Sequence, residues 1–240
     1  MTLLEIENLN VHHGLLHAVR GLSLSLDEGE TTALVGANGA GKSTLLRAIA
    51  GSGPRPDGTI RFADEDLAGV AGHDRVGRGI SLVPEGRRLF RAMTVEENLL
   101  LGGRHGRSGD WNLESVIDAF PKLATLRREK AGNLSGGEQQ ATAIGRGLMC
   151  NPRLLLLDEV SLGLSPAAVD GLYGSLTRVM SQGTAVILVE QDLRRAMDVA
   201  SRVVCLLEGT KVLEGEPAGL GRERVTEAYF GHGRPSEVVA

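Results

Sequence analysis

Cysteine is scarce in this chain of 240 residues, which holds only two, Cys150 and Cys205. They stand far apart and lack the close spacing of metal ligands, so we expect both to be inert thiols in the core. Two cysteines do not make a disulfide framework, and a reducing cytoplasm therefore fits the sequence.

Long apolar runs and an excess of positive charge are also missing. No run approaches the ~18–20 apolar residues that a bilayer span needs. The acidic start, Met-Thr-Leu-Leu-Glu-Ile-Glu, lacks the basic segment of a signal peptide. The formal net charge of −4 gives no general attraction to nucleic acid or anionic lipid. We therefore expect a protein that is soluble by itself, binds no nucleic acid, and reaches a membrane only through partners.

Alternating β and α patterns run along most of the chain. Residues 3–11 and 16–26 alternate between apolar and polar, as half-buried strands do. Further strands are predicted over residues 31–35, 58–63, 79–83, 154–157, 184–189 and 203–207, and helices over residues 42–50, 192–200 and after Ser165-Pro166. Such alternating units predict a mainly parallel sheet that is covered by helices.

Residues 86–150 differ in character, being richer in Arg and Gly and mostly helical. Thr94 and Glu97 form a capping box that opens one helix, and two more helices are predicted over 112–120 and 138–149. We interpret this stretch as a helical lobe inserted into an α/β core. The predicted organisation is one domain over 1–230, with its core in 1–85 and 151–230, its lobe in 86–150, and a loose tail in 231–240.

Residues 36–43, Gly-Ala-Asn-Gly-Ala-Gly-Lys-Ser, follow an apolar strand and open a helix, which is the context of a phosphate-binding loop. Glycines let the backbone curl so that N–H groups converge on phosphate oxygens, and the helix N-terminus adds partial positive charge. Lys42 supplies a point charge near the β and γ phosphates, and the Ser43 hydroxyl is placed to bind Mg²⁺. The predicted nucleotide-binding residues here are Gly36, Ala37, Asn38, Gly39, Ala40, Gly41, Lys42, Ser43 and Thr44.

Two neighbouring carboxylates, Asp158 and Glu159, follow four leucines that form a buried strand. Ligands of open α/β sheets sit at the carboxyl ends of the strands, so both side chains are expected at such a site. We assign Asp158 to hold Mg²⁺ through water, and Glu159 to act as the general base that polarises the attacking water. Two solvated acids that merely close a strand are the alternative interpretation.

Residues 134–138, Leu134, Ser135, Gly136, Gly137 and Glu138, open the helix that follows them. Ser135 and Glu138 have the spacing of a capping box. The two glycines are poor helix formers, and they leave the N–H groups of the first turn bare, which makes a second anion site. Two copies facing head to tail would each close the nucleotide that the other holds.

These three motifs, in this order, resemble those of the nucleotide-binding subunits of ABC transporters over essentially the whole chain up to about Phe230. The resemblance identifies the Walker A motif with residues 36–43, the signature with 134–140 and the Walker B motif with 154–158. It implies an α/β fold with a RecA-like P-loop NTPase core, an antiparallel β subdomain and an inserted helical lobe. It also implies that ATP and Mg²⁺ are bound and that ATP is hydrolysed at the interface of a head-to-tail dimer.

Several positions depart from the usual residues of this family, among them Glu85, Gln191 and His13. Glu85 stands where most members carry a glutamine; its carboxylate can still bind Mg²⁺ or water but adds negative charge near the γ phosphate. Gln191 replaces a switch histidine, and its amide can donate a hydrogen bond to phosphate but cannot take up a proton. His13 occupies the position of an aromatic residue that stacks on adenine, and a surface histidine with no such role is the alternative.

The strings Val-Pro-Glu-Gly-Arg-Arg (83–88) and Leu-Val-Glu-Gln (188–191) resemble the smaller ATPase subunit of branched-chain amino acid importers. That resemblance implies a prokaryotic protein at the cytoplasmic face of the inner or plasma membrane. It also implies two transmembrane permease subunits, a second ABC ATPase subunit and an extracytoplasmic solute-binding protein. Whether the ATPase dimer has identical or different chains is left open.

Three other functions share parts of this pattern. Urea and amide importers are close relatives, although they more often keep glutamine at the position of Glu85. A non-transport ABC ATPase acting on DNA or ribosomes usually has two such domains, or a long coiled coil for which this lobe has no room. A small-molecule kinase shares the phosphate loop but would leave residues 134–138 without a role.

Overall fold

The computed structural model describes residues 1–230 and divides the chain into two units. The first unit comprises Met1–Gly72 together with the C-terminal part of the chain from Ala185 on, and the second comprises His73–Thr184. The predicted tail, residues 231–240, lies outside the described residues. The predicted lobe, residues 86–150, falls within the second unit, and its separation from the core at those bounds stays a prediction.

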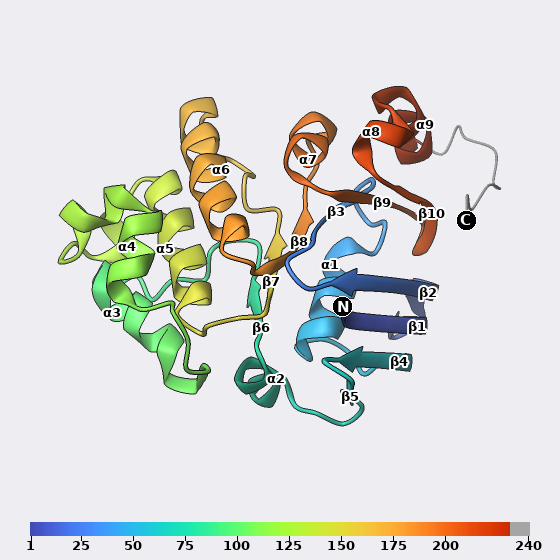
Figure 1. Ribbon diagram of the computed structural model, residues 1–240, viewed down its shortest axis with the longest axis horizontal. Coiled ribbons are helices and arrows are strands. Elements are labelled where there is room, and N and C mark those ends of the chain that lie inside the picture. The colour runs from blue at the N-terminus through green and yellow to red at the C-terminus, as the bar shows by residue number, and fades with distance from the viewer. Residues whose placement is uncertain (231–240) are drawn as a thin grey trace. The chain divides into compact units, whose positions relative to one another are not determined.

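An antiparallel sheet forms one part of the first unit (Figure 1). β1 (Thr2–His13) pairs with β2 (Leu16–Asp27) on one side and with β4 (Asp57–Phe62) on the other, and the short β5 (Glu65–Asp66) extends the edge. Alternate residues of β1 and β2 are buried, which confirms the period-2 reading of the sequence. Helix α1 (Lys42–Ala50) packs against both of these strands.

Parallel strands form the other part of the first unit. β3 (Thr31–Val35) lies between β8 (Ala185–Val189) and β9 (Arg202–Leu207) and is parallel to both. β3 and β8 are buried along their whole length, which explains their continuous apolar sequences. The edge strand β10 (Thr210–Gly215) is antiparallel to β9. The helices of this part are α7 (Leu193–Val199), α8 (Pro217–Leu220) and α9 (Arg222–Phe230).

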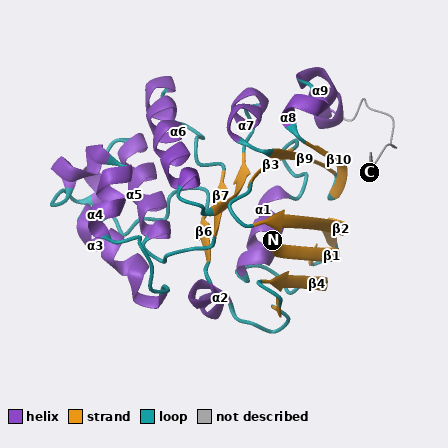
Figure 2. Cartoon of the chain, in the orientation of Figure 1, coloured by secondary structure: helices purple, strands orange, loops and turns teal. Residues whose placement is uncertain are grey.

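The second unit combines two parallel strands with helices (Figure 2). β6 (Ile80–Val83) pairs with β7 (Leu154–Asp158). Helix α5 (Gly136–Leu148) packs against β6 and against the helices α3 (Val95–Gly102) and α6 (Pro166–Ser181). A Cβ atom added to Gly145 of α5 would lie 2.8 Å from side chains of Leu99 and Val116, so this glycine permits close helix packing. The helices are α2 (Gly72–Arg78), α3 (Val95–Gly102), α4 (Leu113–Ala119), α5 (Gly136–Leu148) and α6 (Pro166–Ser181), with 3₁₀ turns at Gly103–His105, Pro121–Leu126 and Ala131–Asn133.

Helix caps largely follow the sequence. The Thr94 hydroxyl accepts a hydrogen bond from the Glu97 N–H at 3.1 Å, and the Thr94 N–H donates to the Glu97 carboxylate at 2.7 Å. Ser165 caps α6, with Pro166 in its first turn. Helix α5 begins at Gly136, two residues before the predicted start, because Ser135 is its N-cap. The two sheets described above confirm the α/β character and the antiparallel β subdomain.

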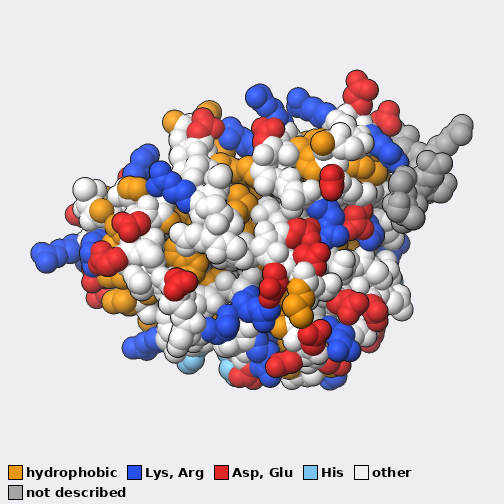
Figure 3. Space-filling model, viewed as in Figure 1, with side chains coloured by type: hydrophobic (Ala, Val, Ile, Leu, Met, Phe, Trp, Pro, Cys, Tyr) orange, Lys and Arg blue, Asp and Glu red, His pale blue; other side chains and the backbone are white. Residues whose placement is uncertain are grey.

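Among residues 1–230, no helix combines the length and the apolar character that crossing a bilayer requires. Figure 3 shows one face, on which basic and acidic side chains are interspersed rather than gathered into a field of one sign.

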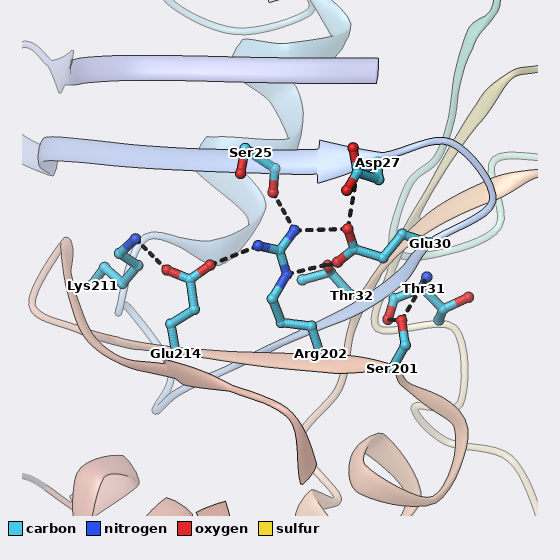
Figure 4. Close-up of polar contacts among 9 residues, drawn as sticks. All are labelled: Ser25, Asp27, Glu30, Thr31, Thr32, Ser201, Arg202, Lys211 and Glu214. Atoms are coloured by element: carbon cyan, nitrogen blue, oxygen red, sulfur yellow. Dashed lines mark hydrogen bonds and ion pairs between the residues drawn. The ribbon is translucent and has the colours of Figure 1, made fainter. Parts of the chain in front are cut away.

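A charged network joins β2, β9, β10 and the turn before β3 in the first unit (Figure 4). The Arg202 guanidinium donates to both carboxylate oxygens of Glu30, at 2.6 and 2.9 Å, and to Glu214 at 2.9 Å. It also donates to the Ser25 carbonyl, and Lys211 pairs with Glu214. Arg202 and both carboxylates are only 16–27% exposed, so solvent screens these ion pairs incompletely.

Replacing Arg202 by leucine is expected to destabilise the protein by about 2–4 kcal/mol, because two partly buried carboxylates lose their shared cation. Urea unfolding measures the change. The matched control is Arg194→Leu, whose side chain is 74% exposed and 3.9 Å from Asp198, and which we expect to change stability by less than about 0.5 kcal/mol. Equal effects of the two substitutions would contradict a structural role for the network.

Candidate nucleotide site

The phosphate loop connects β3 to α1 and lies against two other strands of the first unit. A Cβ atom added to Gly36 (φ +147°) would come within 2.3 Å of the Leu206 carbonyl oxygen in β9. One added to Gly41 (φ +99°) would come within 2.4 Å of the Ala18 carbonyl oxygen in β2. These two glycines are therefore required both by the backbone conformation of the loop and by its close approach to its neighbours.

The Lys42 ammonium is held inside the curl of this loop. Its side chain is 4% exposed, and Nζ donates to the carbonyl oxygens of Gly36 at 2.7 Å and Ala37 at 3.0 Å. The charge thus lies at the centre of the segment whose N–H groups are predicted to bind phosphate. A buried cation in this position suits a polyanionic ligand.

The structure brings two of the unusual residues next to the loop. His13 Nε2 is 3.2 Å from the Thr44 hydroxyl, and Gln191 Nε2 donates to the Asn38 side-chain oxygen at 3.4 Å. His13 and Gln191 are both exposed, so their side chains are accessible to a ligand. The first unit therefore assembles the phosphate loop, His13 and Gln191; the roles assigned to these residues stay predictions.

The second unit gathers three acidic residues at one edge of its parallel strands. Val83 of β6 is in register with Leu157 of β7, so Glu85 and the Asp158–Glu159 pair follow neighbouring strand ends. Asp158 is 1% exposed, whereas Glu159 is half-buried and Glu85 is exposed. The three residues therefore follow the same edge of the two parallel strands, and the roles assigned to them stay predictions.

Glu159 has a left-handed backbone conformation, with φ +49°. This region is unfavourable for a residue with a Cβ atom and costs on the order of 1 kcal/mol. The chain bends directly after β7, so Glu159 does not continue the extended geometry of Asp158. Backbone strain of this kind is common at functional sites.

The first turn of α5 carries the predicted signature residues. The Ser135 N–H donates to the Glu138 carboxylate at 2.8 Å, which is the reciprocal bond of the predicted capping box. A Cβ atom added to Gly137 would lie 3.0 Å from the Cβ atom of Ala168 in α6. Gly137 therefore has a packing role that the sequence motif does not indicate.

The two cysteines fit the description of inert thiols. Burial raises the pKa of the Cys205 thiol to about 11, although the nearby Lys42 charge opposes the shift. Burial also raises the pKa of Cys150, whose Sγ donates to the Gly102 carbonyl oxygen at 3.1 Å. Cys205 is fully buried in β9, and neither thiol has the lowered pKa of a reactive cysteine.

We expect iodoacetamide at pH 8 to leave Cys205 unmodified in the folded protein, because about 0.1% of a thiol with that pKa is ionised. Cys150 should react slowly, and both should react within minutes in urea. Mass spectrometry of the two peptides measures the modification. Rapid labelling of Cys205 without denaturant would contradict its described burial.

Comparison with known proteins relates this geometry to a family. Residues 19–161 match the ABC transporter family. The chain is 39% identical to the high-affinity branched-chain amino acid transport ATP-binding protein BraG of Pseudomonas aeruginosa, over 95% of this chain and all of that protein. It is 30% identical to the lipopolysaccharide export system ATP-binding protein LptB of Escherichia coli K12, over 96% of this chain and 98% of LptB.

A solved structure agrees with these matches. The ADP conformation of MJ1267, an ATP-binding cassette of an ABC transporter, superimposes with a TM-score of 0.81 at 27% identity. The alignment covers 95% of this chain and 94% of MJ1267. The chain belongs to the ABC transporter family, as one of its ATP-hydrolysing subunits.

Proposed function

We propose that this protein is the motor subunit of an importer for branched-chain amino acids, which binds MgATP between two ATPase protomers. The observation that carries the proposal is the full-length likeness to BraG, at 39% identity against 30% for LptB. Two transmembrane permease subunits and an extracytoplasmic solute-binding protein complete the assembly. The chain then lies at the cytoplasmic face of a prokaryotic inner or plasma membrane.

The phosphate loop of one protomer and the bare first turn of α5 of the other enclose the nucleotide in this proposal. The two anion sites lie in different units of the chain, the loop in the first and Ser135 to Gly137 in the second. In a head-to-tail pair, the phosphate loop of each protomer faces the first turn of α5 of the other, because each protomer has both anion sites. Helix α5 has 13 residues, long enough to present a substantial helix dipole at Ser135.

Mg²⁺ fits the donor set of the site. Ser43 and Asp158 supply a hydroxyl and a carboxylate, the hard oxygen ligands that Mg²⁺ prefers, and Glu85 can add a second carboxylate. When bound, the ion neutralises charge on the β and γ phosphates. Lys42 binds the same phosphates, Glu159 accepts a proton from the attacking water, and the Gln191 amide orients the γ phosphate.

Uptake of radiolabelled leucine into cells of the source organism tests the cargo. Cells that lack this chain should lose high-affinity uptake, wild-type protein should restore it, and the Glu159→Gln variant should not. Uptake of labelled urea and acetamide by the same cells provides the comparison. Unchanged leucine uptake together with loss of urea or amide uptake would replace the proposed cargo, and unchanged uptake of all three would exclude this group of importers.

A further inference from the structure

Residues 86–88 form an unusual turn between Glu85 and the exposed Phe90. Gly86, Arg87 and Arg88 have φ angles of +79°, +64° and +49°, so three consecutive residues are left-handed, and two of them carry a Cβ atom. Each such residue is disfavoured and persists only where the surroundings enforce it.

Arg87 connects the turn to the first turn of α5. Its guanidinium donates to the Gln139 side-chain oxygen at 3.1 Å, and Gln139 Nε2 donates in turn to the Leu134 carbonyl oxygen at 3.0 Å. A Cβ atom added to Gly136 would lie 3.2 Å from an Arg87 nitrogen, so the guanidinium passes close over that residue. Arg87 is thus in contact with the signature segment through a fixed amide.

A second connection lies further along α5. The Arg146 guanidinium donates to the Arg87 carbonyl oxygen at 3.2 Å, and it lies over the Phe90 ring at 5.8 Å from the centroid. Burial lowers the pKa of Arg146, as expected for a guanidinium removed from water. Arg87 therefore contacts α5 at Gln139 and at Arg146, seven residues apart, and the Phe90 ring lies against Arg146 of the same helix.

The far end of this segment is fixed by Asn98, which is fully buried in α3. The Phe90 N–H donates to the Asn98 side-chain oxygen at 2.9 Å, and Asn98 Nδ2 donates to the carbonyl oxygens of Phe90 and Thr94 at 3.1 and 2.9 Å. The Phe90 ring is nevertheless 55% exposed. A rigid backbone thus presents an exposed ring whose position is linked to α5.

We propose that Arg87 is a positioning residue, which makes the Glu85–Phe90 segment and the first turn of α5 move together. Arg87 lies two residues after Glu85 and reaches Leu134 of the signature segment through Gln139, and both belong to the proposed site, so this inference rests on the proposed function. Displacement at Phe90 is transmitted through Arg87 and Gln139 to the signature residues. Gln139 is the partner of Arg87 on α5. Among the described side chains, it alone accepts a hydrogen bond from the Arg87 guanidinium.

ATP hydrolysis by the purified chain tests the catalytic consequence. Arg87→Ala should lower kcat about tenfold, equal to about 1.4 kcal/mol, and leave KM for ATP within about twofold, since the phosphate loop is unchanged. Gln139→Leu should have the same effect, and the double variant should be no worse than either single one. Arg87→Lys should recover part of the rate, because its ammonium can still donate to Gln139.

Arg88→Ala is the matched control, because Arg88 is exposed, has the same charge and adopts the same backbone region. It should leave kcat unchanged. Equal losses in Arg87→Ala and Arg88→Ala, or losses that multiply in the double variant, would overturn the proposal. If Arg87→Ala does not fold, the Gln139→Leu variant tests the proposal instead, because it keeps the Arg87 side chain and removes only its acceptor.

Hydrogen exchange gives a readout that needs no nucleotide and so separates this inference from the proposed function. In the otherwise wild-type chain, Phe90→Ala should increase the hydrogen exchange rate of backbone amides in residues 134–140. In a chain that already carries Arg87→Ala, it should cause no further increase. Exchange in residues 134–140 that responds to Phe90→Ala equally in both backgrounds would show that Arg87 does not transmit the displacement. Wild-type protein without ATPase activity would count against the proposed function and leave this exchange test intact.

Discussion

Replacing Glu159 by glutamine is expected to slow ATP hydrolysis by about 10²–10⁴-fold while ATP binding is retained. The amide keeps the size of the carboxylate but cannot accept a proton from the attacking water. Its left-handed backbone, φ +49°, sets Glu159 apart from the extended β7 that ends at Asp158. Steady-state phosphate release and equilibrium binding of a fluorescent ATP analogue measure the two quantities separately.

Glu208→Gln is the matched control for this substitution. Glu208 also has a left-handed backbone, φ +47°, and is exposed after β9 in the first unit. It should hydrolyse ATP at the wild-type rate. If Glu159→Gln keeps most of its turnover, another residue is the base, and the role assigned to Glu159 is wrong.

Replacing Lys42 by alanine is expected to weaken ATP binding by about 30- to 1,000-fold, or about 2–4 kcal/mol. The buried ammonium is the cation at the centre of the phosphate loop, and its removal also leaves two loop carbonyls, those of Gly36 and Ala37, without this donor. Isothermal titration with ATP measures the change.

Lys122→Ala serves as the control for lost positive charge, because Lys122 is exposed and belongs to the second unit. We expect its ATP affinity to match that of the wild type. An unchanged affinity in Lys42→Ala would mean that the loop does not bind the phosphates.

Local signals in the sequence predicted much of the fold. The period-2 pattern predicted β1 and β2, apolar runs predicted the buried β3, β7 and β8, and the capping residues Thr94 and Ser165 predicted the starts of α3 and α6. Helix α2 and the edge strand β10 were not predicted, because neither has a clear apolar periodicity. The C-terminal helices α8 and α9 were missed for a similar reason, since α9 has one fully buried residue, Val225.

Short motifs indicated where the candidate site lies. The phosphate loop, the acidic pair after β7 and the cap at Ser135 could be located from spacing alone. The Arg87–Gln139 contact could not, because it joins residues 52 positions apart in sequence. The tight packing of Gly137 against Ala168 was also hidden, since only tertiary structure brings α6 next to the first turn of α5.

In the proposed arrangement two protomers share each nucleotide, and mixing two inactive variants shows whether they do. Lys42→Ala removes the phosphate-loop cation, and Ser135→Arg places a bulky side chain at the exposed N-cap of α5. Each variant alone should be inactive. An equimolar mixture should regain about a quarter of the wild-type ATPase rate, because half of randomly paired dimers hold one intact composite site out of two. A mixture that forms dimers by native mass spectrometry but stays inactive, or full activity of Ser135→Arg alone, would contradict the account.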